Sequence, residues 1–197
     1  MSKIFLETPP NIGSPTVLIP ALRERWSPRS FDETAVISDA ELEAILQAAR
    51  WAPSASNSQP SRFIVGRRGT PTFAMISEAL MGFNAAWANK ASALVVAILQ
   101  TETSDQVPHQ WGEYDLGQAV AHLSVQAQAE GLHTHQMAGV EWAHIIQEFS
   151  LPENLKPITV VAVGYVAPPH LLPEKLALRE IAPRTRLPLE DIVIAKD

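Results

Sequence analysis

The stretch Ala52-Pro53-Ser54-Ala55-Ser56-Asn57-Ser58-Gln59-Pro60 lies between an amphipathic segment and the apolar run Phe63-Ile64-Val65. Because proline fixes φ and lacks a backbone donor, its two prolines end the preceding helix and confine the stretch to a loop. Its serine and asparagine side chains can bond nearby backbone groups and fix a turn. Two interpretations are open: a helix-to-strand connection, or a loop that holds a flat polar ligand.

Helical and strand patterns alternate on both sides of this loop. Ser38 and Glu41 have the spacing of a capping box and predict a helix over 39–51. The continuous apolar runs 91–99 and 158–165 are typical of strands buried on both faces. We also expect a strand over 62–66, a strand or loop over 133–139, a strand-like end at 192–194, and helices over 17–25, 72–80, 84–88, 114–130 and 141–149. This alternation predicts an α+β or α/β layered domain.

The length of 197 residues fits a single domain over 1–197. Three prolines and a glycine make residues 1–16 an extended arm. Charged residues are only 18% of the chain and hydrophobic residues 46%, so the surface is thinly charged for a monomer. We therefore expect part of the surface to be buried against a partner subunit.

Charge and composition exclude several classes of function. The net charge of −6 argues against nonspecific nucleic-acid binding, and the absence of cysteine excludes disulfides and thiolate chemistry. No apolar run reaches the length of a membrane span, and the N-terminus lacks an apolar signal core. We therefore expect a cytoplasmic protein with no nucleic-acid or membrane partner.

Two short basic patches stand out in this acidic chain. Arg25, Ser27 and Arg29 alternate, so that an extended backbone places them on one side, where two guanidinium groups and a hydroxyl could bind a phosphate. The other interpretation is a solvated basic turn. A second pair, Arg184 and Arg186, lies near the C-terminus.

The histidines are candidate metal ligands. His133 and His135 alternate, but Glu141 and Glu148 lie at unconvincing spacing, and the chain has no His-Glu-x-x-His pattern. We expect no metal site.

Four patterns, in order along nearly the whole chain, resemble the nitroreductase family of FMN-dependent oxidoreductases. They are Arg-x-Ser-x-Arg at 25–29, Ala-Pro-Ser-x-x-Asn-x-Gln-Pro at 52–60, Gly-Leu at 131–132 followed by a glycine at 139, and Arg-x-Arg at 184–186. The resemblance implies a three-layer α+β fold with a central mixed, mainly antiparallel sheet flanked by helices. It also implies a domain-exchanged homodimer in which residues 168–197 pack on the partner subunit and FMN binds at the interface.

The same resemblance implies three groups of FMN-binding residues. The phosphate and ribityl chain would be held by Arg25, Trp26, Ser27, Arg29, Arg184 and Arg186. The isoalloxazine ring would be lined by Pro53, Ser54, Ala55 and Asn57 of the other subunit. The polar edge and reactive central nitrogen of the ring would face Asn84, Met137, Ala138 and Gly139.

The activity implied is ping-pong hydride transfer from NADH or NADPH through FMN to a nitroaromatic, quinone or similar conjugated acceptor, with no catalytic acid or base from the protein. The alternatives are a specialised flavoenzyme (a dehalogenase, an oxidase or a flavin-fragmenting enzyme) or a non-enzymatic flavin-binding protein. Trp87 stands where the family often has a lysine, and it could stack on a substrate or lie in the core. Residues 111–115 could form a lid or begin the long helix.

Overall fold

The computed structural model describes residues 17–197, so the arm expected over 1–16 lies outside the described residues. Four strands form one sheet in the order β1-β2-β4-β3, with the bounds β1 Ser61–Arg67, β2 Ala93–Gln100, β3 His133–Met137 and β4 Leu155–Gly164. Every pairing among these strands is antiparallel. The α+β class and the mainly antiparallel sheet are confirmed, whereas the four described strands show no parallel pairing of the kind a mixed sheet would have.

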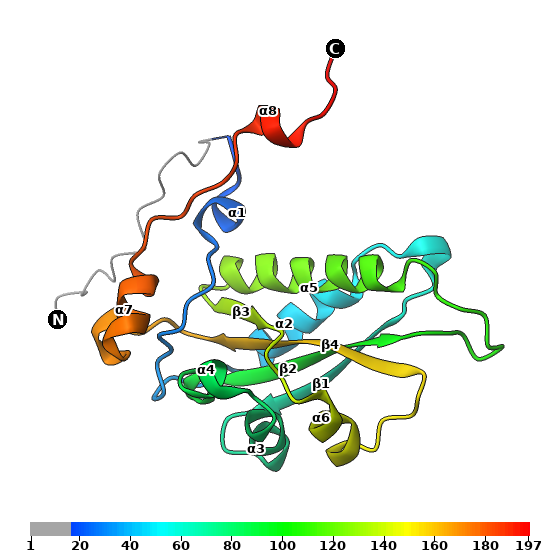
Figure 1. Cartoon of the computed structure of the whole chain (residues 1–197), viewed down its shortest axis with the longest axis horizontal. Helices are drawn as coiled ribbons and strands as arrows, with labels where there is room; N and C mark the ends of the chain where they lie inside the picture. Colours follow the sequence, from blue (N-terminus) through cyan, green and yellow to red (C-terminus); the bar gives the residue numbers. More distant parts are fainter. Residues whose placement is uncertain (1–16) are drawn as a thin grey trace.

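Helices cover both faces of the sheet, which confirms the three layers (Figure 1). One face is covered by α2 (Asp39–Arg50) and the long α5 (Gly112–Ala129), and the other by α3 (Pro71–Glu78) and α6 (Trp142–Glu148). The shorter helices are α1 Pro20–Glu24, α4 Gly82–Ala85, α7 Glu174–Glu180 and α8 Leu189–Ile192, with 3₁₀ turns at Ala55–Asn57, Ala88–Lys90 and Pro169–Leu171.

Burial of both sheet faces explains the continuous apolar run of β2. Its alternate residues enter two different cores: Leu94 and Val96 pack beneath α3 and α6, whereas Val95 and Ala97 pack beneath α2 and α5. Such runs are typical of parallel sheets, but the cause is burial on both faces rather than strand direction. Here helices on both sides of an antiparallel sheet produce the same pattern.

Local signals placed the helix ends correctly. Ser38 Oγ accepts from the Glu41 backbone N–H at 3.2 Å and the Glu41 carboxylate accepts from the Ser38 N–H at 2.8 Å, so the capping box is confirmed. At the end of α5, Gly131 has φ +77°, and the Leu132 N–H bonds the carbonyl of Ala127 at 2.8 Å. This is a Schellman motif, which favours glycine at this position.

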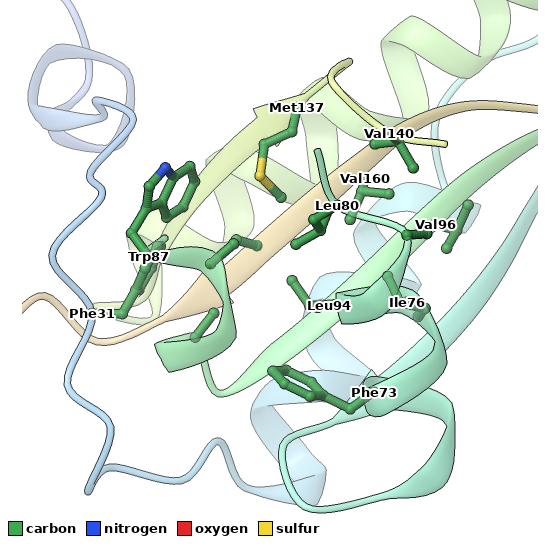
Figure 2. Packing of buried hydrophobic residues seen from close by; sticks show 14 of the residues in the cluster. Phe31, Phe73, Ile76, Leu80, Trp87, Leu94, Val96, Met137, Val140 and Val160 are labelled. Atoms are coloured by element: carbon green, nitrogen blue, oxygen red, sulfur yellow. The ribbon is translucent and has the colours of Figure 1, made fainter. Parts of the chain in front are cut away.

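Trp87 lies in the core that contains α3 and α6 (Figure 2). Its side chain has no exposed surface, and its ring stacks on Phe31 with centroids 6.1 Å apart. This burial contradicts the alternative in which Trp87 stacks on a substrate. Its indole N–H is buried and has no hydrogen-bond partner among residues 17–197.

The C-terminal segment runs away from the sheet (Figure 1). The strand expected at 192–194 is wrong: Ile192 ends α8, and Ile194 is fully exposed. A strand requires a neighbouring strand, and no pairing reaches this segment within the described chain. Within residues 17–197, none of the helices is both long enough and apolar enough to cross a membrane.

Candidate functional site

The two basic patches, which are about 150 residues apart in sequence, meet in one cavity of about 230 Å³. We call it the arginine pocket; it is lined by Arg25, Trp26, Ser27, Arg29, Arg179, Glu180, Ala182, Arg184 and Arg186. All six residues expected at a phosphate site from these patches are therefore brought together. This clustering disfavours the solvated basic turn.

Like charges in the arginine pocket oppose one another. Burial lowers the pKa of the Arg25 guanidinium, and the nearby Arg186 and Arg184 lower it further. Burial and the neighbouring Arg186 likewise lower the pKa of Arg184. Among residues 17–197, five arginines and one carboxylate line the cavity, so these residues give the pocket a surplus of positive charge that an anion would neutralise.

Arg184 both ties the two patches together and offers a donor. Its Nη1 donates to the backbone carbonyls of Glu24 at 3.1 Å and Arg25 at 2.8 Å. Its Nε is buried and has no hydrogen-bond partner in the part of the chain that the structure describes. A buried donor without an acceptor is costly, so this atom indicates a place for an anionic oxygen.

Glu180 and Arg179, at the end of α7, are pocket residues that the sequence analysis missed. Glu180 is 1% exposed, and its Oε1 accepts from the backbone N–H groups of Arg29 and Ser30, each at 2.8 Å. Burial raises the pKa of the Glu180 carboxyl, although the two backbone donors counteract this effect. One sequence signal existed: a carboxylate in the last turn of a helix opposes the helix dipole.

A neutral group of predicted residues gathers where β3 ends. The Asn84 side chain donates to the carbonyl of Gly139 at 3.2 Å, and the Met81 backbone N–H donates to the same carbonyl at 3.1 Å. A Cβ at position 139 would lie 2.9 Å from Asn84 Nδ2, so a larger residue there would displace the Asn84 amide from its present position. Met137 is buried and Ala138 is exposed beside it, so all four predicted residues of this group lie together.

Strand β3 leads from the arginine pocket to this neutral group. His133 packs edge-on against Trp26, and His135 packs against Trp87. His135 Nδ1 lies 2.8 Å from the Pro28 carbonyl, which fixes Nδ1 as the donor. Burial lowers the pKa of each histidine to about 4, so both are neutral at pH 7.

These two histidines pack against tryptophans and the backbone near Pro28. Among residues 17–197 no group of three or more metal-ligating side chains comes together. They hold the segment that carries Arg25 and Arg29 against the sheet.

The loop between Pro53 and Pro60 is strained. Ser56, Asn57 and Gln59 all have positive φ, at 52°, 57° and 49°. The Ala55 backbone N–H donates to Asp115 Oδ2 at 3.1 Å, and Asp115 is only 4% exposed. The loop borders a largely apolar cavity of about 410 Å³ between α2, β1 and α5. Three strained residues and a dedicated carboxylate are more than a simple connection requires.

Within one chain the loop and the arginine pocket lie at opposite ends of α5. Asp115, which binds the loop, is in the first turn of α5, whereas Trp26 packs on His133, just beyond its last turn. An 18-residue helix spans about 27 Å, so one chain does not bring the two together. Residues 112–115 form the first helical turn, which contradicts a lid there.

Comparisons with known proteins agree with this geometry. The family model described as the nitroreductase family matches residues 22–165. A protein of Streptomyces coelicolor, provisionally named an NADH dehydrogenase/NAD(P)H nitroreductase, is 30% identical over 162 residues, which cover 71% of this chain and 78% of that protein. An uncharacterised 15.4 kDa protein of Mycolicibacterium smegmatis is 33% identical over 138 residues, covering 66% of this chain and 92% of its own length.

Solved structures are similar over most of the chain. One described as an oxidoreductase containing FMN has a TM-score of 0.84 and 35% identity, and covers 89% of this chain and 90% of its own. A nitroreductase family protein from Clostridium difficile 630 has a TM-score of 0.68 and 27% identity, and covers 88% of this chain and 94% of its own. With the motifs assembled as described above, these matches show that the chain belongs to the nitroreductase family.

Proposed function

We propose that this protein is an FMN-dependent oxidoreductase that passes a hydride from NADH or NADPH to a nitroaromatic, quinone or similar conjugated acceptor. The observation that carries the proposal is the arginine pocket, a cluster of cations drawn from residues near both ends of the chain. The names of two relatives, one containing FMN and one an NAD(P)H nitroreductase, support the same cofactors.

The residues present fit FMN. A phosphate monoester suits the guanidinium donors of Arg25, Arg29 and Arg186, and it would supply an acceptor for the buried Nε of Arg184. The isoalloxazine edge suits the amide of Asn84 and the exposed residue Ala138, which lie at the far end of β3. When bound, FMN supplies a ring that takes up a hydride and gives it to the acceptor.

We propose a homodimer that completes this site. The Pro53–Pro60 loop and the arginine pocket would meet only if the loop of one subunit faced the pocket of the other. Apolar side chains left exposed at the C-terminus, including Leu187, Leu189 and Ile194, favour packing on a partner. A groove of about 820 Å³, lined by Leu22, Trp51 and Val125 among others, offers a surface for it.

The chain's own residues bind and orient rather than transfer protons. The surroundings of the ring would be neutral, because His135 is uncharged at pH 7 and position 87, where the family often has a lysine, carries a tryptophan buried in the core. A lysine there would stabilise negative charge on a reduced flavin, so its loss favours a second candidate. That candidate is a specialised flavoenzyme on the same scaffold, such as a dehalogenase, an oxidase or a flavin-fragmenting enzyme.

A visible absorption spectrum tests the proposal, recorded on purified protein with added FMN and repeated without oxygen in NADH and then NADPH. Flavin bands that bleach with either nucleotide support the reductase. Bands that persist with both favour the second candidate. Failure to take up FMN at all would overturn both.

A further inference from the structure

Two charged side chains from the C-terminal part of the chain bond the backbone around the N-terminal patch (Arg25, Ser27 and Arg29). One of them donates hydrogen bonds and the other accepts them. Arg184 donates to backbone carbonyls at Glu24 and Arg25, whereas Glu180 accepts from backbone N–H groups at Arg29 and Ser30. The two ties lie at the two ends of residues 24–30. Together they fix the distance between the arginines of one patch and those of the other.

We propose that Glu180 is the positioning residue of the arginine pocket: its buried carboxylate holds residues 24–30 at the spacing that lets the arginines of both patches reach one phosphate. This proposal rests on the proposed function, because the phosphate is taken to be that of FMN. Glu180 would not touch the cofactor. It would act through the backbone from which Arg29 projects.

Several features distinguish Glu180 from an ordinary stabilising residue. A carboxylate with 1% exposure, at the negative end of a helix, is costly to the fold. In the described part of the chain, its one charged partner within ion-pair range is the Arg29 guanidinium, at 3.9 Å. Such a weak pair does not repay burial, so the carboxylate's main contribution is to hold the two backbone donors. Residues that oppose local preferences, as a buried carboxylate at the C-terminal end of a helix does, concentrate at functional sites.

The neighbouring Arg179 extends the same framework toward the ring end of the site. Its guanidinium lies over the Phe83 ring, 5.1 Å from the centroid, and Phe83 directly precedes Asn84. The last turn of α7 therefore contacts the N-terminal patch through Glu180 and α4 through Arg179. Glu180 therefore serves the phosphate end of the site, and Arg179 serves the ring end.

One competing account gives Glu180 the opposite role. Two adjacent backbone N–H groups also suit a phosphate, so Glu180 could occupy the place of the ligand and be displaced by it. In that case, removing the carboxylate would strengthen phosphate binding. The near-complete burial of Glu180 argues against displacement.

The test compares FMN with riboflavin, which carries the same ring but no phosphate, by titrating flavin fluorescence in each variant. Glu180→Gln keeps one oxygen that can accept both N–H groups, so FMN affinity should stay within about threefold. Glu180→Leu leaves both donors unpaired, and FMN affinity should fall about tenfold to a hundredfold. Riboflavin affinity should be unchanged in both variants.

Two further variants keep the test decisive. Glu180→Asp retains the charge but is one methylene shorter, so it should weaken FMN binding by about three- to tenfold, even if the leucine variant does not fold. Glu174→Gln removes an exposed carboxylate at the other end of α7 and should leave both flavins unaffected.

The outcomes separate the two proposals. Equal losses for FMN and riboflavin would show general damage and overturn the positioning role, as would tighter FMN binding in the glutamine variant or unchanged FMN binding in the leucine and aspartate variants. If the unaltered protein binds no FMN, the proposed function fails, whatever the variants do.

Discussion

The arginine pocket and the Pro53–Pro60 loop are both irregular segments, but they present different chemical groups. Charged side chains hold the pocket by bonding backbone groups, as Glu180 does with Arg29 and Ser30. The loop has a strained backbone at Ser56, and it is held by Asp115, whose carboxylate accepts from the Ala55 N–H. A buried carboxylate therefore fixes the backbone in both regions. The pocket presents cations, whereas the loop presents neutral groups on a strained backbone.

This difference assigns the two regions to different parts of one ligand. Positive charge suits a phosphate, which is small and ionic and whose binding weakens as the salt concentration rises. A rigid neutral loop suits a flat ring, for which the position of the backbone matters more than charge. Substitutions in the pocket should therefore affect FMN alone, and substitutions in the loop should affect FMN and riboflavin alike.

The largest expected effect comes from the double substitution Arg25→Ala/Arg186→Ala. Each arginine lost removes a charge-assisted contact of about 1.5–3 kcal/mol, so FMN affinity should fall by roughly a hundredfold to ten-thousandfold. Fluorescence titration against FMN and riboflavin measures this loss. Lys175→Ala is the matched control, because it removes an exposed cation from α7 outside the pocket.

Full FMN occupancy of the double variant after dialysis would contradict the assignment of the pocket. A parallel loss of riboflavin affinity would instead remove the distinction between the two regions.

The second prediction concerns the histidines behind the pocket. Burial depresses the pKa of His133 and His135 from 6.5 to about 4, so both stay neutral in the fold while the unfolded chain takes up protons. Their contribution to stability is present above pH 6.5 and is lost as the pH falls toward 4. At pH 5 each should have lost about 2 kcal/mol of unfolding free energy, as measured by urea unfolding.

His135→Asn tests this sign, because the asparagine amide can still donate to the Pro28 carbonyl but cannot titrate. The drop in unfolding free energy between pH 7.5 and pH 5 should shrink by about 2 kcal/mol relative to the unaltered chain. The exposed His170→Asn serves as the control. An unchanged drop in the His135 variant would contradict the assigned pKa.

The sequence predicted the regular parts of the fold because their signals are local. The capping box at Ser38 and the glycine at 131 specify helix ends through neighbouring residues alone. The end at 192–194 was wrong because β-branched residues favour a strand only where a partner strand exists, and the folded chain supplies none there.

In the candidate site, too, the sequence predicted the residues with local signals and missed those that act over long distances along the chain. Motifs located the arginines, since side chains that bind an anion recur at fixed spacing. Glu180 and Asp115 escaped notice because each acts on a backbone far along the chain, a relation that no local pattern encodes. Trp87 was left open because an aromatic residue suits a core and a ligand equally well.

The third prediction concerns the hydrogen bond that holds the Pro53–Pro60 loop. Asp115→Leu removes the hydrogen bond between the Ala55 N–H and a charged carboxylate, so unfolding free energy should fall by about 1–3 kcal/mol, and both flavins should bind more weakly by similar factors. Glu113→Leu is a close control in the same first turn of α5, since it removes only an exposed ion pair to Lys156. That change should cost less than about 1 kcal/mol. Loss of FMN affinity alone in the Asp115 variant would contradict the division of roles.

The smallest effect tests backbone strain directly. Ser56 has φ +52° and Ser58 has φ −69°, although both are serines in the same loop. At position 56, glycine relieves the strain of positive φ, and this gain offsets the conformational entropy that glycine loses on folding. At position 58 there is no such strain to relieve, so glycine only adds the entropy cost. Ser56→Gly should therefore be more stable than Ser58→Gly by about 1 kcal/mol. For a chain of this length that difference corresponds to about 2–4 °C in Tm, which calorimetry resolves. Equal melting temperatures would show that Ser56 is not strained, and backbone conformation would then no longer distinguish the loop from the pocket.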